Sequence, residues 1–292
     1  MELTPALTET KSFLTVEMLD KISAMPPGQR RQAMQIVGQE EWNRCAEDIF
    51  YWIDPNAHIV PYVYTKDPKA MHICNICNNN TTHDFHKRAI HLLNSHGITT
   101  KSEADLRKHF KELDTIRALR PMPYFKPILE QMLKEQLIAI EKSRDMMATW
   151  LVVLFYTWDT LFHRGRQNIF QSETATKTLD LVDRAWTLYD NQPGWLKAVH
   201  KAQIGQGTNR AGLLTVPTLK NSQIIGFPQG ADKIRQYHPT GIFCDEAAFN
   251  PDAGDTFMAI KPAIAGGGRY TAISSANMGW FYYVCTDQLD SI

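Results

Sequence analysis

Hydrophobic residues recur at helical spacing through the first part of the chain, and prolines interrupt them at two places. The pattern breaks at Pro26–Gly28 and ends before Pro55, because the residue that precedes a proline avoids the helical region. These patterns predict a mainly helical N-terminal region over residues 1–69. The expected elements are helices over Val16–Ile22, Arg30–Val37 and Glu40–Ile53, followed by a short strand over Ile59–Tyr64.

In the later part of the chain, short apolar runs alternate with amphipathic segments. Such alternation predicts a mostly parallel sheet between two layers of helices, an α/β fold over residues 101–292. The expected strands are Leu137–Ile140, Gln167–Ser172, Leu213–Val216, Ser222–Phe227, Ile242–Cys244 and Tyr270–Ile273, with the third and fourth pairing with each other. The expected helices are Glu103–Ile116, Ile128–Leu137, Met147–Thr157 and Thr174–Tyr189, with a rigid connector over Arg120–Pro127 and a loop with a short helix over Gln229–Gln236.

Composition is that of an ordinary folded protein. Of the 292 residues, 43% are hydrophobic and 21% are charged, and a net charge of zero predicts no particular partner. No apolar run reaches the roughly 20 residues that cross a bilayer, and the N-terminus does not resemble a signal peptide. The five cysteines are therefore expected to be reduced thiols or metal ligands in a cytoplasmic protein.

A cluster of cysteine and histidine residues stands between residues 70 and 100. Its spacing, Cys74-x2-Cys77-x13-His91-x4-His96, predicts a tetrahedral zinc site in a small insertion. The gap of thirteen residues is one longer than in the commonest zinc fingers, and the cluster could also have arisen by chance. His72, His83 and His86 are rival ligands.

Four protein ligands would leave no open position for water, so a zinc ion here is expected to stabilise the fold. Binding of DNA by this finger-like insertion is the alternative, because the start of its helix carries Lys87 and Arg88.

Two adjacent carboxylates, Asp245 and Glu246, follow the apolar run Ile242–Cys244. A buried parallel strand that carries chemistry at its C-terminal tip has this form. In a nucleotide hydrolase the first acid holds Mg²⁺ and the second orients the attacking water. An ordinary junction between a strand and a turn, without a functional role, would have the same sequence pattern.

A strand, a polar turn and a long apolar helix run from Leu137 to Thr157, as in a phosphate-binding loop. When the pattern G-x4-G-K-[ST] is aligned on Thr149 as the Mg²⁺-binding hydroxyl, Lys142 replaces the first glycine and Ala148 replaces the lysine. Lys142 could still reach the phosphates from the opening of the loop, with Arg144 as a second cation. The alternative is an ordinary charged turn. The candidate nucleotide-binding residues are Lys142, Ser143, Arg144, Asp145, Met146, Met147, Ala148 and Thr149.

Four stretches together resemble, in their order, the ATPase half of the large terminase subunit of tailed phages, the motor that pumps DNA into procapsids. They are Lys142–Thr149, Phe227–Arg235, Ile242–Glu246 and Ile273–Asn277, and the resemblance covers roughly residues 45–292 without the insertion.

The resemblance implies a P-loop NTPase of the ASCE type that uses ATP and Mg²⁺. It implies that Ser275 and Asn277 belong to a coupling motif that senses the γ-phosphate, and that Arg144 or Arg235 acts as an arginine finger. The implied partners are double-stranded viral DNA, the portal protein and the small terminase subunit, in a homo-oligomeric ring in the host cytoplasm. An isolated ATPase piece could be monomeric.

The sequence departs from the family pattern at several points. Asp145 stands where glutamine is common, Gln236 stands where glycine is frequent, and Gln131 is an uncertain choice for the adenine contact. The family's nuclease domain has no counterpart in these residues, so DNA cleavage is not expected of them.

Two other interpretations remain. The chain could be a zinc-finger DNA-binding or scaffold protein with a degenerate nucleotide fold that does not hydrolyse ATP. It could also be a helicase-type ATPase, although such enzymes are expected to carry a second motor domain.

Overall fold

The structure is a computed structural model, and it describes residues 16–54, 61–64, 72–73, 80–81, 116–119, 122–204, 212–227, 234 and 237–286. The chain divides into two compact units. Unit 1 comprises Met1–Met122 with Asp190–Val199, and unit 2 comprises Pro123–Tyr189 with His200–Ile292.

Unit 1 contains the predicted N-terminal helices, with different boundaries. A single helix, α2, runs through Gly38, where a Cβ atom would lie 3.0 Å from the carbonyl oxygen of Trp195. The break comes later, at Asp48, whose side chain accepts a hydrogen bond of 2.8 Å from the Phe50 N–H and starts α3. The helices of this unit are α1 (Val16–Ser23), α2 (Pro27–Glu47), α3 (Ile49–Ile53) and α9 (Gly194–Lys197).

Two small antiparallel pairs complete the described part of unit 1. Strand β1 (Tyr62–Tyr64) pairs with β4 (Ile116–Ala118), and β2 (His72–Ile73) pairs with β3 (Asn80–Thr81). The prediction of a helix up to Ile116 is wrong at that residue, because Ile116 pairs with Tyr64 across the sheet. The rest of that predicted helix lies outside the described residues.

Unit 2 is built on a six-stranded sheet in the order β5-β10-β9-β6-β8-β7. All neighbouring strands are parallel except β7 and β8, which are antiparallel. The prediction of a mostly parallel α/β sheet is therefore confirmed. Its strands are β5 (Leu137–Glu141), β6 (Gln167–Gln171), β7 (Leu213–Val216), β8 (Ser222–Gly226), β9 (Gly241–Asp245) and β10 (Arg269–Ser274).

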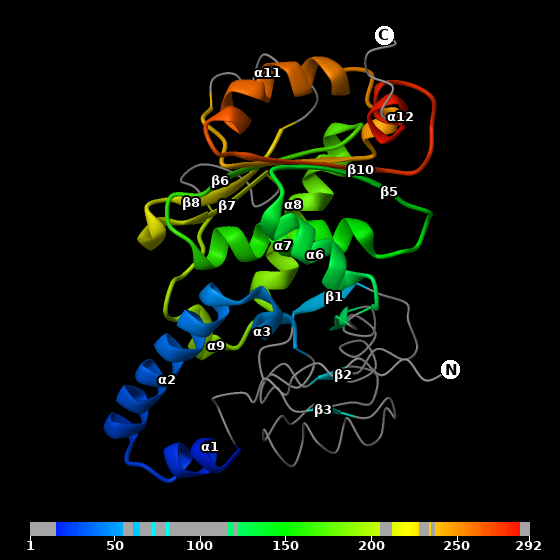
Figure 1. Cartoon of the computed structure of the whole chain (residues 1–292). Helices are drawn as coiled ribbons and strands as arrows, with labels where there is room; N and C mark the ends of the chain where they lie inside the picture. Colours follow the sequence, from blue (N-terminus) through cyan, green and yellow to red (C-terminus); the bar gives the residue numbers. More distant parts are fainter. Residues whose placement is uncertain are drawn as a thin grey trace. The chain divides into compact units, whose positions relative to one another are not determined.

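Helices lie on both sides of this sheet (Figure 1). On one side are α6 (Phe125–Lys134), α7 (Ala148–Phe162) and α8 (Ala175–Asp190), and on the other are α11 (Ala253–Ala265) and α12 (Trp280–Cys285). The sequence patterns did not predict α11 or α12. Two short 3₁₀ turns, η2 (Pro217–Leu219) and η3 (Ala247–Phe249), follow β7 and β9.

Helix α6 begins and ends three residues earlier than its sequence pattern predicts. Pro127 fits the first turn, where its missing N–H costs no hydrogen bond. Leu137 is unavailable to the helix because it pairs with Tyr270 in the sheet.

The centre of unit 2 is formed by α7 and β9. Helix α7 is apolar on nearly all sides, and only Thr149 and Asp159 among its residues are not buried. All five residues of β9 are buried. At the start of β9, a Cβ on Gly241 would lie 2.4 Å from both the Asn168 Oδ1 atom and the Tyr156 ring, so only glycine permits this close approach.

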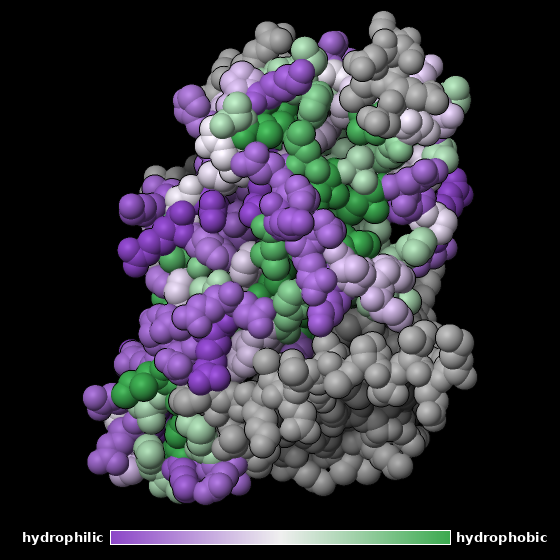
Figure 2. All heavy atoms as spheres, in the orientation of Figure 1, coloured by the Kyte–Doolittle hydropathy of each residue, from purple (hydrophilic) through white to green (hydrophobic). Residues whose placement is uncertain are grey.

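On the described surface, hydrophilic and hydrophobic residues are interspersed on the face that Figure 2 shows. Among the helices of the described ranges, none combines the length and the apolar character needed to cross a bilayer.

Candidate functional site

Three strand ends bring the predicted site residues together. Strand β10 lies between β5 and β9 and is parallel to both, so the three carboxyl ends meet at one edge of the sheet. In register, Ser274 stands beside Glu141, and Ile273 stands beside Asp245. Residues that follow β5 and β9 are thereby placed on either side of the end of β10.

Lys142, the first residue after β5, forms an ion pair with Glu246. Its Nζ atom lies 2.8 Å from the Glu246 Oε1 atom, and its backbone N–H donates to the Ser274 carbonyl at 2.9 Å. The side chains of Lys142 and Glu246 are only 11% and 23% exposed, so solvent screens this pair incompletely. The lysine at the opening of the loop therefore reaches the second acid of the predicted acidic pair.

Asp245 faces the first turn of α7. The hydroxyl of Thr149 donates a hydrogen bond of 3.1 Å to the Asp245 Oδ1 atom. Burial raises the pKa of Asp245 above its ordinary value; the charge of Lys142 opposes this, and the carboxylate of Glu246 adds to it. A cation placed beside this buried carboxylate would favour its ionised form.

Glu246 occupies a strained backbone position at the end of β9. Its φ of 51° lies in the left-handed region, which non-glycine residues rarely adopt. The hydroxyls of Ser274 and Ser275 lie 3.3 and 3.5 Å from its Oε2 atom. Burial raises its pKa, but the hydrogen bond and charge of Lys142, together with the bonds from Ser275 and Ser274, lower the pKa below its ordinary value. Glu246 is therefore held as an oriented carboxylate.

The loop between β5 and α7 presents backbone N–H groups at the start of a long buried helix. Asp145 and Met147 both have positive φ, 61° and 54°. Met147 is the N-cap residue of α7, and no side chain caps the first N–H groups of that helix. A left-handed residue before a helix N-terminus forms a concavity of N–H donors that suits an anion. Each strained residue costs roughly 1–2 kcal/mol.

The other predicted site residues lie in different surroundings. Ser143, Arg144, Asp145 and Met146 are exposed, whereas Ala148 is buried. The amide of Asn277 donates to the Ala248 carbonyl at 3.1 Å, so Asn277 contacts the turn that follows β9. Arg235 lies outside the described residues, as do Cys74, Cys77, His91 and His96, with the rivals His83 and His86.

Two residues near the acidic pair were not singled out from the sequence. The hydroxyl of Ser274 accepts a bond of 3.2 Å from the Ala248 N–H in addition to its contact with Glu246. The guanidinium of Arg184 on α8 lies 5.1 Å from the ring centre of Trp150. Its charge, like that of Lys142, opposes the rise in the pKa of Asp245 that burial causes. Ser274 belongs to the Ile273–Asn277 stretch and could have been chosen from it. Arg184 carries no signal in the sequence, because it is one charge within an amphipathic helix.

Asp245 and Thr149 fit a magnesium ion, since a carboxylate and a hydroxyl are the hard oxygen ligands that Mg²⁺ uses together with phosphates. Within the described ranges, this site included, no group of three or more His, Cys, Asp or Glu residues could hold a metal ion. The structure therefore does not support a zinc site in its described part, and the four predicted zinc ligands lie outside that part.

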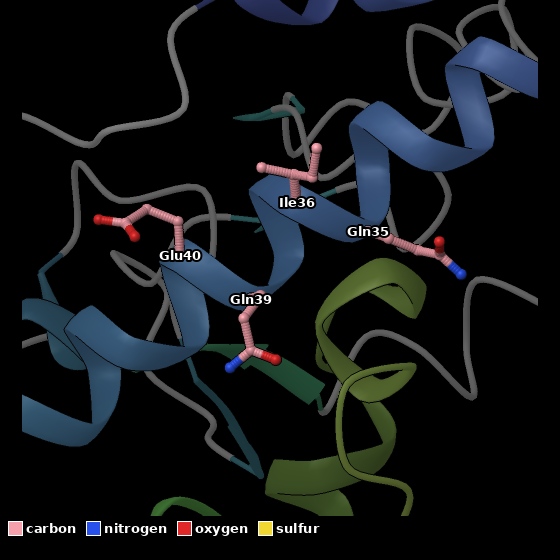
Figure 3. A pocket seen from close by; sticks show the side chains of 4 residues that line it. All are labelled: Gln35, Ile36, Gln39 and Glu40. Carbon is pink, nitrogen blue, oxygen red and sulfur yellow. The ribbon is translucent and has the colours of Figure 1, made fainter.

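A separate hollow of about 470 Å³ lies along α2 in unit 1. Figure 3 shows its four lining side chains spreading outward from this single helix. Ile36 is 65% exposed, and Glu40 is already paired with Arg44 at 3.4 Å. The lining residues are Gln35, Ile36, Gln39 and Glu40. One paired carboxylate and two amides provide neither a nucleophile nor a pair of acids, so we do not consider this hollow an active site.

No protein-family model matches the sequence. No curated protein matches it either.

Solved structures that resemble the chain include several phage large terminases. The large terminase of bacteriophage HK97 shares 12% identity at a TM-score of 0.47, covering 60% of this chain and 38% of that protein. A variant of the ATPase domain of the Thermus phage P74-26 large terminase shares 17% at 0.44, covering 60% and 72%. The UvsW helicase of bacteriophage T4 shares 12% at 0.38, covering 66% and 73%. The chain is thus similar to the ATPase domains of phage large terminases and to a phage helicase.

Proposed function

We propose that unit 2 is a P-loop ATPase of the ASCE type. The observation that carries this proposal is the convergence of Lys142, Thr149, Asp245 and Glu246, with separations of 2.8 and 3.1 Å, at the carboxyl edge of a parallel sheet. The insertion of β10 between the loop-bearing strand β5 and the acid-bearing strand β9 supports the ASCE assignment.

Each residue has a distinct task in this proposal. The N–H groups of the loop and of the first turn of α7 bind the phosphates, and Lys142 adds a positive charge. Thr149 and Asp245 would hold Mg²⁺, which neutralises phosphate charge when bound. Glu246 accepts a hydrogen bond from the attacking water and orients it toward the γ-phosphate. Arg144, which is exposed, is free to reach a phosphate of this or of a neighbouring subunit.

Glu246 is the ion-pair partner of Lys142 in the structure described, and it would compete with phosphate for that lysine. An ammonium group has three donors, so Lys142 can turn to a phosphate oxygen as ATP enters. Ser274 and Ser275 remain as hydroxyl partners of Glu246 at 3.3 and 3.5 Å. Release of Lys142 would therefore leave Glu246 oriented by the two hydroxyls, and the Oε1 atom of Glu246 would become available to water.

The first test is ATP hydrolysis by the purified chain. We expect phosphate release in the presence of Mg²⁺, its loss when EDTA removes the metal, and its recovery when excess Mg²⁺ is added back. The rate is measured with a coupled phosphate assay. Binding of ADP without any hydrolysis would favour the alternative of a scaffold protein with a degenerate nucleotide fold.

We further propose that ATP hydrolysis drives translocation of double-stranded viral DNA into a procapsid. The resemblance of the four motifs to phage large terminases supports this, as does the ASCE-type strand order. Portal protein, small terminase subunit and a homo-oligomeric ring belong to the same proposal. Stimulation of the ATPase by duplex DNA supports it, whereas stimulation by single-stranded DNA alone would favour the helicase alternative.

We propose a structural zinc site at Cys74, Cys77, His91 and His96 on the basis of their spacing. Elemental analysis of the purified chain is expected to find one zinc per chain. Replacing Cys74 and Cys77 by serine should abolish the bound zinc, and replacing Cys285, an exposed free cysteine, should not. A wild-type chain without zinc would show the assignment to be wrong.

A further inference from the structure

The loop between β5 and α7 lacks the glycines that such a loop normally uses. Aligned on Thr149, Met147 takes the place of the second glycine of the phosphate-loop pattern. Met147 nevertheless adopts the left-handed conformation with φ 54°, and Asp145 does so with φ 61°. Aspartate tolerates this conformation moderately, but methionine does so poorly. A strained conformation of this kind persists only where its surroundings hold it.

Tyr124 contacts the peptide that lies between the two strained residues. Its hydroxyl donates a hydrogen bond of 2.7 Å to the carbonyl of Met146. Among the described residues, this is the one side-chain hydrogen bond that the loop backbone receives from another element. Tyr124 is partly buried, and its ring meets that of Phe125 edge to face at a distance of 5.3 Å.

Tyr124 itself stands on a fixed support. It is the N-cap residue of α6, and Phe125, Leu129 and Met132 of that helix are each no more than 1% exposed. At the other end of α6, the guanidinium of Arg269 donates to the carbonyls of Met132, Leu133 and Glu135. Arg269 is the first residue of β10, so α6 is bound to the sheet at its C-terminus while its N-terminus holds the loop.

We propose that Tyr124 is a positioning residue of the nucleotide site, whose hydrogen bond to Met146 holds the glycine-poor loop in its phosphate-binding conformation. The role in nucleotide binding rests on the proposed ATPase function. The physical basis of this role is that one means of stabilising the loop backbone replaces another. Glycine would make the left-handed backbone intrinsically favourable, and here an external hydrogen bond from α6 stabilises it instead.

The test begins with Tyr124→Phe, which removes the hydroxyl and keeps the ring. In the free protein, we expect faster hydrogen–deuterium exchange in peptides covering residues 143–148 and unchanged exchange in β9. In calorimetric titrations, we expect ADP to bind roughly three- to tenfold more weakly, the range for the loss of one hydrogen bond. Tyr283→Phe on α12 is the matched control and should change neither measurement.

A second variant separates positioning from general stability. In a Met147→Gly background the more strained of the two left-handed positions is relieved and the loop depends less on the external hydrogen bond, so Tyr124→Phe should weaken ADP binding by less than about twofold. A penalty of the same size in both backgrounds would overturn the proposal, as would unchanged loop exchange in Tyr124→Phe. If the wild-type chain binds no ADP, the ATPase proposal fails, while the exchange measurement still decides whether Tyr124 holds the loop.

Discussion

Replacing Glu246 with glutamine is expected to lower kcat for ATP hydrolysis by about 10²–10⁴-fold, the usual contribution of a positioned general base. Glutamine keeps the size of the side chain, and its amide oxygen can still accept a hydrogen bond from Lys142 while its NH2 group donates to the Ser274 hydroxyl. It lacks the negative charge that polarises the attacking water. Steady-state phosphate release measures the effect.

Nucleotide binding by the same variant should persist and should even become tighter. In the wild-type chain, the Glu246 carboxylate holds the Lys142 ammonium at 2.8 Å and would compete with the phosphate of a bound nucleotide for it. A neutral amide competes less strongly. Glu130→Gln, at an exposed position of α6, is the matched control and should hydrolyse ATP as the wild type does. Hydrolysis at the wild-type rate by Glu246→Gln would contradict the assignment of the base.

Replacing Lys142 with alanine is expected to weaken binding of ATP and ADP by about 10–100-fold, as for the loss of a hydrogen bond to a charged group. The side chain is only 11% exposed, so the lost charge lies where solvent compensates poorly. Titration calorimetry with each nucleotide measures the effect. ADP is the more direct probe, because Lys142→Ala also removes the partner of Glu246 and so affects turnover in a second way.

Lys177→Ala on α8 serves as the control for that experiment. Its side chain is 54% exposed, and its ammonium pairs with Glu173, which lies four residues earlier in the sequence. It should leave nucleotide affinity unchanged. If Lys142→Ala also binds normally, the phosphate-binding cation must be another residue of the loop, and Arg144 is the first candidate.

Much of unit 2 could be predicted from hydrophobic patterning. Strands β6 to β10 were expected within one or two residues of their observed ends, because short segments with apolar residues at their centres and polar turns on either side leave few other structures. The sequence did not predict a helix where its local residue preferences conflicted with the hydrophobic pattern. Helix α11 contains Gly254 and Pro262, both of which argue against a helix in an isolated sequence.

Tertiary contacts also moved the ends of predicted elements. Leu137 continues the amphipathic pattern of α6, yet it pairs with Tyr270 as the first residue of β5. Ile116 pairs with Tyr64 rather than ending a helix. In both cases a hydrogen-bonded neighbour far away in the sequence decided the conformation, and local propensity is too weak to oppose it. The zinc site and the role of Arg235 remain predictions.

Hydrophobic patterning alone is enough to predict that Ile242–Cys244 is buried and that Asp245 and Glu246 stand at the end of a strand. Burial of an apolar run is favourable wherever it occurs, and two carboxylates must stay near solvent or a partner. The position of β10 between β5 and β9 follows from tertiary packing, because strand order depends on the whole sheet. That order joins Lys142 to Glu246 across more than a hundred residues, and the contact from Tyr124 accompanies a left-handed backbone at Met147 that its residue type would not predict.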